Sequence, residues 1–550
     1  MRLARIGVGA SIGLLSAAVA LGVGEVVAAF VRPAASPVIV VGNRFILLTP
    51  EPVKRWAIRS FGTHDKTVLL SGIYVVIAAL AVVVGLLALR RRRDGLIGIA
   101  VFGGIGVYAA LSTNAHRGSD VIPSIFGTLA ALAVLVVLVR AAGTDAAPGS
   151  PPPDAAAGPG RPARVRPAGR AGPAGRAAAA AVGAPGWAAN RRGFLQGSAA
   201  AAALAAVAGF GGRAAQHARF DVATARAKLR LPAPVEPAVP PAPVAQVVNG
   251  PDLGKSGVPW NTPNSDFYRI DTAISVPQIE PKNWSLRIHG MVDRELRLNY
   301  SELLARPLIE RWITLCCVSN EVGGGLVGNA RFLGARLADL LREAGVHAGA
   351  DQLVMSSSDG MTIGAPTAVV MDGRDALVAV GMNGVPLPIV HGFPARIVVP
   401  GLYGYVSACK WVVDIEATTF ASNQAYWVQG GWSAQTEIKL QSRIDTPGSG
   451  ATVKVGQPVA IAGIAWDQHV GISQVEVQVG KGEWRSARLA PVPSTDTWRQ
   501  WVLPWTPPKA GQYTLRVRAV DAAGTVQPPT YQDVFPSGAT GLHTVTVHAR

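Results

Sequence analysis

The chain is poor in charge, in aromatic side chains and in cysteine. Of its 550 residues, 15% are charged, 6% are aromatic and 3 are cysteines. Three cysteines cannot make a disulfide framework or a four-cysteine zinc site. Basic residues outnumber acidic ones by 51 to 34, but they lie in short clusters beside apolar runs. This distribution argues against nucleic-acid binding, which favours a basic stripe or face.

Hydrophobic residues make up 49% of the chain, which is too much for an ordinary soluble protein and indicates membrane spans. Residues 1–142 contain four apolar runs, each near the ~20 residues needed to cross a bilayer: 7–31, 67–89, 95–112 and 121–139. Arg2, Arg5 and the cluster Arg90-Arg-Arg-Arg93 place the N-terminus and the second loop in the cytoplasm. The end of the fourth run is then cytoplasmic as well.

These runs contain no histidine, because His64 and His116 fall in the loops between them. A membrane haem held by paired imidazoles is therefore not expected, and no CxxCH motif for covalent haem occurs. The helices are predicted to form an anchor or a docking unit for a partner. Glu25 is the one carboxylate inside a predicted span, near its outer end.

Residues 143–190 consist mainly of Ala, Gly, Pro and Arg and predict a disordered, basic, cytoplasmic linker. The run Asn190-Arg-Arg-Gly-Phe-Leu-Gln-Gly197 resembles a twin-arginine (Tat) export signal in an internal position. Residues 191–212 also have the composition of a fifth span, and the two interpretations are compatible. This pathway exports folded proteins, so a domain that loads a cofactor in the cytoplasm could work outside.

The rest of the chain is predicted to contain a spacer and two domains. Residues 213–249 form a Pro-rich spacer, and residues 250–436 mix strand and helix patterns, which predicts an α+β domain. In residues 437–550 short period-2 strands alternate with Gly/Pro turns, as in Val475, Val477 and Val479. This pattern predicts an immunoglobulin-like β-sandwich. The predicted fold class is thus multi-domain: transmembrane helices, an α+β domain and a β-sandwich.

Cys316 and Cys317 are adjacent, after a β-like run and before a glycine-rich turn. A helix is predicted next, with Leu333, Leu337 and Leu340 on one face together with Leu341. The residues leave four roles open for the thiols: buried structural groups, a vicinal disulfide, a Cys–His nucleophile, or a ligand for a soft metal. A single thiolate cannot hold a metal alone, so a cofactor would have to supply the other ligands.

Ordered motifs in residues 255 to 550 resemble the sulfite oxidase family, in its membrane-anchored actinobacterial form. They are Phe267-Tyr-Arg-Ile-Asp271, Thr314-Leu-Cys-Cys-Val-Ser-Asn320, Ala335-Arg-Leu-Ala-Asp-Leu-Leu341, Met382-Asn-Gly-Val-Pro-Leu-Pro388, His391-Gly-Phe-Pro-Ala-Arg396 and Lys410-Trp411. The C-terminal block, from Gly463-Ile-Ala-Trp466 to Gln527-Pro528, resembles the family's dimerisation domain.

The resemblance implies a molybdenum–molybdopterin cofactor. Cys317 matches the family's metal ligand and would bind molybdenum as a thiolate, whereas Cys316 would not be a ligand. His391 and Arg396 match positions that hold the pterin and its phosphate, and a guanidinium suits phosphate because it is always charged and binds bidentately. Further pterin contacts match Tyr268, Arg269, Ala408, Cys409 and Lys410.

The implied reaction is two-electron oxygen-atom transfer on a small substrate, with electrons exchanged with a separate cytochrome or quinone-linked partner. Asp271 stands where the family places an arginine that faces the substrate oxyanion, and a carboxylate would repel sulfite. A reductase of methionine sulfoxide in proteins, or of another sulfoxide, is the alternative. A non-enzymatic cell-surface scaffold is a remote one, since a scaffold needs neither the cysteine loop nor the His391–Arg396 motif.

The predicted location is the cell membrane. The protein is expected to be multi-pass, with its catalytic domain on the extracytoplasmic side and a homodimer contact through the C-terminal domain.

Overall fold

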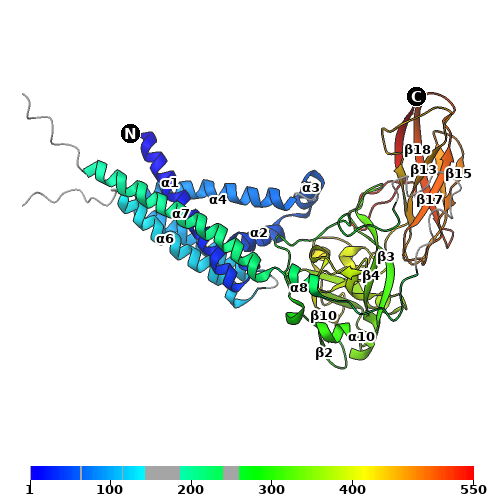
Figure 1. The fold of residues 1–550 in the computed structure, drawn as a ribbon, viewed down its shortest axis with the longest axis horizontal. Coiled ribbons are helices and arrows are strands. Elements are labelled where there is room, and N and C mark those ends of the chain that lie inside the picture. Colours follow the sequence, from blue (N-terminus) through cyan, green and yellow to red (C-terminus); the bar gives the residue numbers. More distant parts are fainter. Residues whose placement is uncertain (1, 62–64, 114–115, 143–185, 240–258) are drawn as a thin grey trace, which may run out of the picture. The chain divides into compact units, whose positions relative to one another are not determined.

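The computed structural model describes residues 2–61, 65–113, 116–142, 186–239 and 259–550 (Figure 1). The chain divides into two compact units. The first contains Met1–Leu48 and Ser60–Arg219, and the second contains residues 49–59 and Phe220–Arg550. Nearly all of the linker predicted at 143–190 lies outside the described residues.

The first unit is built from long apolar helices. Among the described residues, five helical segments are long and apolar enough to cross a membrane: Arg5–Val31, Lys66–Arg90, Arg92–Leu111, Gly118–Ala141 and Arg192–Lys228. They correspond to α1 (Arg2–Val31), α4 (Asp65–Arg90), α5 (Arg92–Leu111), α6 (Ile122–Ala141) and α7 (Gly186–Phe220). Every predicted span therefore coincides with such a helix, although α7 extends past both ends of the predicted 191–212.

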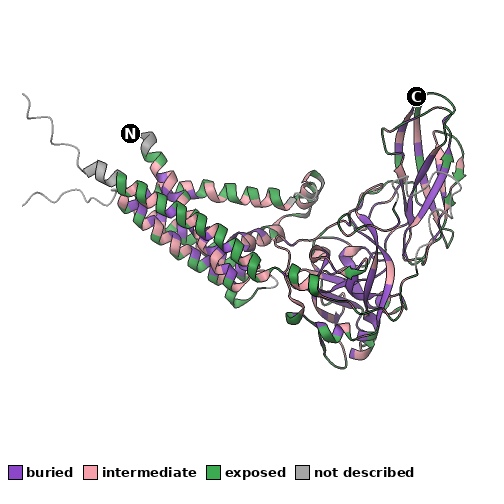
Figure 2. Cartoon of the chain, viewed as in Figure 1, coloured by how far each residue is buried: buried purple, intermediate pink, exposed green. Residues whose placement is uncertain are grey.

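Much apolar surface of these helices faces outward, as Figure 2 shows by the exposed residues along them. Phe210 on α7, for example, is 77% exposed. Exposing such an apolar surface to water costs free energy, whereas exposing it to lipid does not. The outward faces therefore fit a lipid environment.

Small residues let the helix backbones approach closely. A Cβ atom at Gly13 of α1 would overlap the carbonyl of Ala81 in α4, and one at Gly85 would overlap the carbonyl of Gly9. A Cβ at Gly127 of α6 would likewise overlap the Ala20 carbonyl. Close contact through small residues is a principal source of helix packing in membranes.

Two carboxylates of this unit are paired within the protein. Glu25 accepts hydrogen bonds from the Ser36 hydroxyl, at 2.8 Å, and from the Gln216 amide, at 2.7 Å. Arg32 forms an ion pair with the buried Asp120. The carboxylate inside the first span is therefore hydrogen-bonded within the protein.

Two helices were not predicted between the first two spans. The loop holds α2 (Pro37–Leu48), which is apolar but too short to cross a bilayer, and α3 (Glu51–Phe61). Residues 49–59 belong to the second unit. The Lys54 ammonium donates to the Tyr426 hydroxyl at 2.7 Å and lies over the rings of Tyr426 and Trp427.

The domain after the spans is built on two sheets with short helices between their strands. One sheet has the order β2-β1-β10-β5-β6, and the other has the order β3-β4-β7-β8 with β9 paired to β7. The first sheet is mixed, because β1 and β10 are parallel, and the named strands of the second are all antiparallel. Its strands are β1 (Ser285–Gly290), β2 (Leu296–Asn299), β3 (Leu308–Cys316), β4 (Val327–Arg336), β5 (Gln352–Ser357), β6 (Thr362–Pro366), β7 (Leu377–Met382), β8 (Val385–Pro386), β9 (Arg396–Val398) and β10 (Val412–Thr418). Its helices are α9 (Tyr300–Leu304), α10 (Leu337–Ala344), α11 (Thr367–Met371) and α12 (Tyr426–Gln429). Strands and helices are mixed as predicted, with strands predominating.

The cysteine region differs from the prediction in one respect. Strands β3 and β4 are antiparallel, with Cys316 opposite Val327, so the glycine-rich segment is a hairpin loop. Leu333 lies in β4, not in a helix, because β4 runs on to Arg336 and pairs with β7 on its other side. Helix α10 begins only at Leu337, which with Leu340 and Leu341 is buried.

The predicted spacer at 213–249 is not a free spacer where the structure describes it. Its first residues continue α7, and α8 (Ala223–Lys228) follows. Val235 then donates to the Leu308 carbonyl at 2.8 Å, and Glu310 donates to the Glu236 carbonyl at 2.9 Å. These residues therefore pair in parallel with β3, which is the edge strand of its sheet. Residues 240–258 lie outside the described part.

The C-terminal domain is a two-sheet β-sandwich, as the alternating pattern predicts. The sheets have the orders β11-β13-β17-β16 and β12-β19-β18-β14-β15. The strands are β11 (Gln441–Thr446), β12 (Thr452–Val453), β13 (Val459–Trp466), β14 (Ile472–Val479), β15 (Trp484–Ser486), β16 (Arg488–Leu489), β17 (Arg499–Trp505), β18 (Gly511–Asp521) and β19 (Thr544–Ala549). Val475 and Val477 point into the core between the sheets.

Candidate functional site

A cavity of about 130 Å³ lies in the domain after the spans, which contains strands β1 to β10. The loop after β3, the segment at 267–272 and the loop from His391 to Trp411 line it together. Seven of the eight predicted site residues are in its wall: Tyr268, Cys317, His391, Arg396, Ala408, Cys409 and Lys410. Arg269 is not in the wall, but it forms an ion pair with Asp271, which is.

The two adjacent cysteines have different environments. Cys316 ends β3 and packs in the hydrophobic core, and Cys317 lines the cavity. Neighbours along an extended chain point to opposite sides, which accounts for the division. Both thiols are free. Burial raises the pKa of Cys317, whereas hydrogen bonds from Ser319 and the charge of Lys410 lower that pKa.

The sandwich domain supports the strand that carries these cysteines. The Thr314 amide donates to the Asp496 carbonyl at 3.0 Å, and the Trp498 amide donates to the Thr314 hydroxyl at 2.8 Å. The Gln468 side chain donates to the Thr314 carbonyl at 3.1 Å. The position of Cys317, three residues further on, therefore depends on the C-terminal domain.

Arg396 is a buried cation whose hydrogen bonds go to carbonyl oxygens, and its guanidinium lies over the Phe332 ring. It is 5% exposed, and it donates to the carbonyls of His391, at 3.2 Å, and of Ala408, at 3.5 Å. No described carboxylate pairs with it. Burial lowers its pKa to about 10, which still leaves it charged at neutral pH. A buried charge is stable only with a counter-charge, so this position fits an anionic ligand.

His391 is placed as a neutral hydrogen-bond donor. Its Nε2 atom lies 3.1 Å from the carbonyl oxygen of Asn264, which can only accept. Burial, and then the charge of Arg396, lower the pKa of His391 to about 4. Gly392 follows with φ of +112°, and a Cβ there would press on Arg396 and on the backbone of Lys410. The glycine allows both cationic residues to reach the cavity.

Asp271 bridges two cations, which bears on its expected effect on an anion. Its Oδ2 atom accepts from Lys410 Nζ at 2.7 Å and from Arg269 Nε at 2.8 Å. Burial lowers the pKa of Lys410 to about 8, and Asp271 opposes that shift. Because the carboxylate is compensated by two positive groups, the predicted repulsion of sulfite does not follow from this geometry.

Of the remaining predicted residues, Cys409 is buried and Tyr268 is half-buried. Tyr268 stacks on Phe267 with ring centroids 5.2 Å apart. Burial and the neighbouring cysteines raise its pKa well above the usual value, so its phenol is neutral. Burial raises the pKa of Cys409 as well, and its sulfur lies 3.8 Å from the Met355 carbonyl oxygen.

Several residues of the site were not predicted. Ser319 lies within the quoted cysteine motif, yet no role was assigned to it. Tyr405, Trp427 and Trp432 add aromatic surface to the cavity, and Asp359 adds a second carboxylate. The aromatic residues follow no regular spacing, and their pattern carries no signal of the site.

The donors present fit a molybdopterin cofactor. A thiol suits molybdenum, which binds through sulfur, and the unpaired Arg396 suits a phosphate. Lys410 provides a second buried cation on the same cavity. The fit rests on one thiol, two cations and the space between them. The protein offers only one metal ligand here, and the pterin would supply the others.

Comparisons with known proteins agree with this fit. The family model described as an oxidoreductase molybdopterin binding domain matches residues 273–427, and a bacterial Ig domain model matches residues 441–517.

Three curated relatives show the extent of the similarity. Mitochondrial sulfite oxidase of Drosophila melanogaster is 30% identical over 340 residues, which cover 52% of this chain and 58% of that protein. Sulfite oxidase of Gallus gallus is 31% identical, covering 50% and 69%, and the uncharacterized oxidoreductase YuiH of Bacillus subtilis is 31% identical, covering 32% and 85%. The match thus spans less than two thirds of several mitochondrial relatives. The chain belongs to the sulfite oxidase family of molybdopterin-dependent oxidoreductases.

Proposed function

We propose that this chain is a membrane-anchored enzyme that catalyses two-electron oxygen-atom transfer on a small substrate outside the cytoplasm. The observation that carries the proposal is the single cavity that holds the Cys317 thiol beside two buried cations, Arg396 and Lys410. A scaffold protein would have no need to bury these three groups together.

The residues of the cavity would divide the work as follows. Cys317 would bind the metal as a thiolate, with Ser319 hydrogen bonds stabilising its charge. Arg396 would bind the phosphate of the pterin, and His391, neutral and fixed by Asn264, would hold the pterin ring system. The bound cofactor supplies the oxygen-atom chemistry, and the protein supplies position and electrostatics.

Lys410 and Asp271 act as a unit in this scheme. Asp271 fixes the ammonium of Lys410 through a 2.7 Å contact, and the Val390 carbonyl accepts a second, longer hydrogen bond at 3.4 Å. An ammonium has three donors, so one remains for a ligand. An anion in the cavity would be attracted by this ammonium. Sulfite, or another oxyanion of sulfur, is therefore a reasonable substrate class.

A sulfoxide reductase is the second candidate, and the aromatic wall favours it. Met361, Tyr405, Trp427 and Trp432 give one part of the cavity an apolar surface. A neutral sulfoxide with an apolar side chain, such as methionine sulfoxide, would contact that surface favourably. The same cofactor would then work in the reducing direction.

The sidedness of the proposal is supported by the first loop. The arginine clusters predict that residues 32–66 lie outside, on the same side as the catalytic domain. Lys54 from that loop donates a hydrogen bond to Tyr426 of the catalytic domain, which supports placing both on one side. A twin-arginine signal in α7 would allow export after folding. A cytochrome or a quinone-linked protein would exchange electrons with the cofactor, and the sandwich domain would form a homodimer.

The proposal is tested by purifying the full chain from cells that make the cofactor. About one molybdenum and one pterin per chain are expected, since the proposal places one cofactor beside Cys317. The same preparation is then assayed with a dye acceptor on sulfite and with a dye donor on methionine sulfoxide. Absence of molybdenum would refute the proposal, and the two assays would decide the direction of the reaction.

A further inference from the structure

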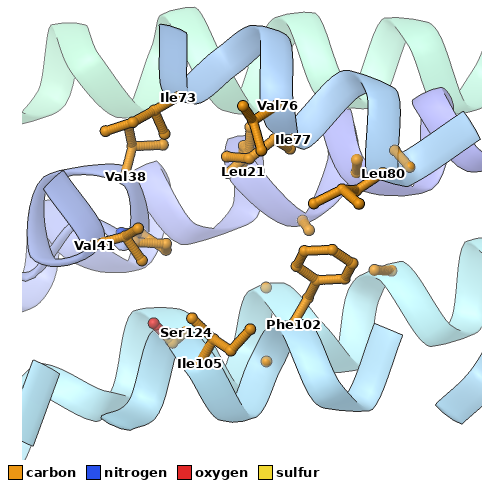
Figure 3. Close-up of a pocket in the computed structure, with 18 of the residues that line it drawn as sticks. Leu21, Val38, Val41, Ile73, Val76, Ile77, Leu80, Phe102, Ile105 and Ser124 are labelled. Atoms are coloured by element: carbon orange, nitrogen blue, oxygen red, sulfur yellow. The ribbon is translucent and has the colours of Figure 1, made fainter. Parts of the chain in front are cut away.

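A second cavity lies among the helices of the first unit. It has a volume of about 530 Å³, and α1, α2, α4, α5 and α6 line it. Figure 3 shows its apolar side chains, among them Leu21, Ile77 and Phe102, facing a common space. A void of this size is far larger than the gaps left by ordinary packing, so it fits an apolar ligand.

Two hydroxyls in its wall have no hydrogen-bond partner among the described residues. Ser16 of α1 is 2% exposed and Ser124 of α6 is 4% exposed, and neither Oγ atom is paired. A hydroxyl in an apolar helix can donate to the carbonyl four residues earlier, and Ser11 and Thr128 do so at 2.9 Å and 2.6 Å. Ser16 and Ser124 do not use this solution. They are therefore available as donors to a ligand in the cavity.

The spacing of these hydroxyls restricts the ligand. Helices α1 and α6 are antiparallel, because Ala20 packs on Gly127 and Gly24 lies beside Pro123. Ser16 is four residues before Ala20, and Ser124 is three residues before Gly127. With a rise of 1.5 Å per residue, the two hydroxyls are about 10 Å apart along the helix axes. A ring with two opposed carbonyls, about 5 Å apart, and two hydrogen bonds of about 2.8 Å would span this distance.

We propose that this cavity binds an isoprenoid quinone, with the ring between Ser16 and Ser124 and the tail along the apolar wall. A phospholipid acyl chain would fill the space but would leave both hydroxyls without acceptors. A quinone satisfies the apolar wall and the two donors together. Its own chemistry also matches the proposed function, on which this inference rests.

The redox balance is simple. A substrate that takes an oxygen atom from water releases two electrons and two protons, and a quinone takes up two of each to become a quinol. The cavity would then be the place where reducing equivalents enter or leave the lipid phase. In the reducing direction the same exchange would run from the quinol to the substrate.

Binding is tested without turnover, using the full chain in phospholipid nanodiscs and ubiquinone-1 as the probe. Saturable binding of one quinone per chain is expected. Gly72 lines the cavity and a Cβ there meets no atom within 4 Å, so Gly72→Phe introduces a ring at the cavity wall without a backbone clash at the Cβ. The dissociation constant should rise at least tenfold in Gly72→Phe and also in the double variant Ser16→Ala, Ser124→Ala.

Gly104→Phe is the matched control, because Gly104 is also open but does not line the cavity. It should bind ubiquinone-1 as the unaltered chain does. Uptake that only follows the amount of lipid, or equal binding in all variants, would overturn the inference. Dye-coupled turnover bypasses the quinone cavity, so it should survive in Gly72→Phe. An unaltered chain that lacks dye-coupled activity would instead count against the proposed function.

Discussion

The two cavities of this protein have almost opposite chemistry. The one among the helices is large, and its polar groups are a few neutral hydroxyls, whereas the one in the catalytic domain is small and holds Arg396, Lys410 and Asp271. Charges can be buried in the second because a β-framework holds partners at fixed distances. The difference indicates two ways of recognising a ligand: shape and a few acceptors in one cavity, charge and a thiol in the other.

The largest effect on activity should come from replacing Cys317, the thiol found in the catalytic cavity and not in the helix cavity. Cys317→Ser should lower dye-coupled turnover by about a thousandfold or more, since a residue that acts on the reacting group is lost. Cys316→Ser is the control, and it should retain most activity because its sulfur packs in the core. Equal losses in both variants would contradict the assignment of Cys317 as the ligand.

A second test removes charge from the catalytic cavity. Arg396→Met should reduce the cofactor retained after purification by about a hundredfold, since a charge-assisted phosphate contact contributes roughly 1.5–3 kcal/mol. Arg396→Lys should retain more, because it keeps the charge but loses the bidentate geometry. The molybdenum and pterin contents are the readout, and a cofactor content unchanged in Arg396→Met would reject the role of Arg396.

The third test is a pH profile. The Lys410 ammonium exists below its pKa of about 8, so the KM for an anionic substrate should rise by up to about tenfold per pH unit above this value. A bound anion would move the inflection upward. Asp271→Asn removes the carboxylate that raises the pKa of Lys410, so its inflection should lie at lower pH. A KM that does not change between pH 7 and pH 10 would exclude Lys410 from substrate binding.

The smallest effect tests the cavity among the helices. Gly13→Leu should destabilise the helix unit by about 1–3 kcal/mol, the usual cost of overpacking, since its side chain would meet the Ala81 backbone. Gly7→Leu is the control, because a Cβ at Gly7 meets no atom within 4 Å. Thermal unfolding in detergent measures both. Equal unfolding temperatures would show that the close α1–α4 contact does not hold the cavity together.

Much of the architecture could be predicted because it is written in local patterns. Apolar runs near 20 residues identify spans, and alternating valines identify sandwich strands. Cys317, His391 and Arg396 could also be selected from the sequence, because each lies in a specific motif, and all three line the cavity. Leu333 shows the limit, since its spacing with Leu337 fits a helix while pairing with β3 and β7 makes it a strand residue.

What could not be predicted depends on contacts between distant segments. The bonds of Thr314 to Asp496 and Trp498 join residues about 180 positions apart, and no local pattern carries them. The same holds for Asp271. Its charge alone predicts repulsion of an anionic substrate, and only the structure shows Lys410 and Arg269 beside it. The orphan hydroxyls of Ser16 and Ser124 are likewise visible only once the helices are packed.

The pairing of residues 235–236 with β3 has a practical consequence for handling the catalytic domain. An uncovered edge strand offers free amides and carbonyls to another chain and favours aggregation. Here the segment entering the domain covers that edge, and Arg311 and Arg336 hold it through Glu236. A soluble fragment should therefore begin before Ala223, so that α8 and the covering segment remain. A fragment starting at residue 250 would leave the edge of β3 uncovered and prone to aggregation.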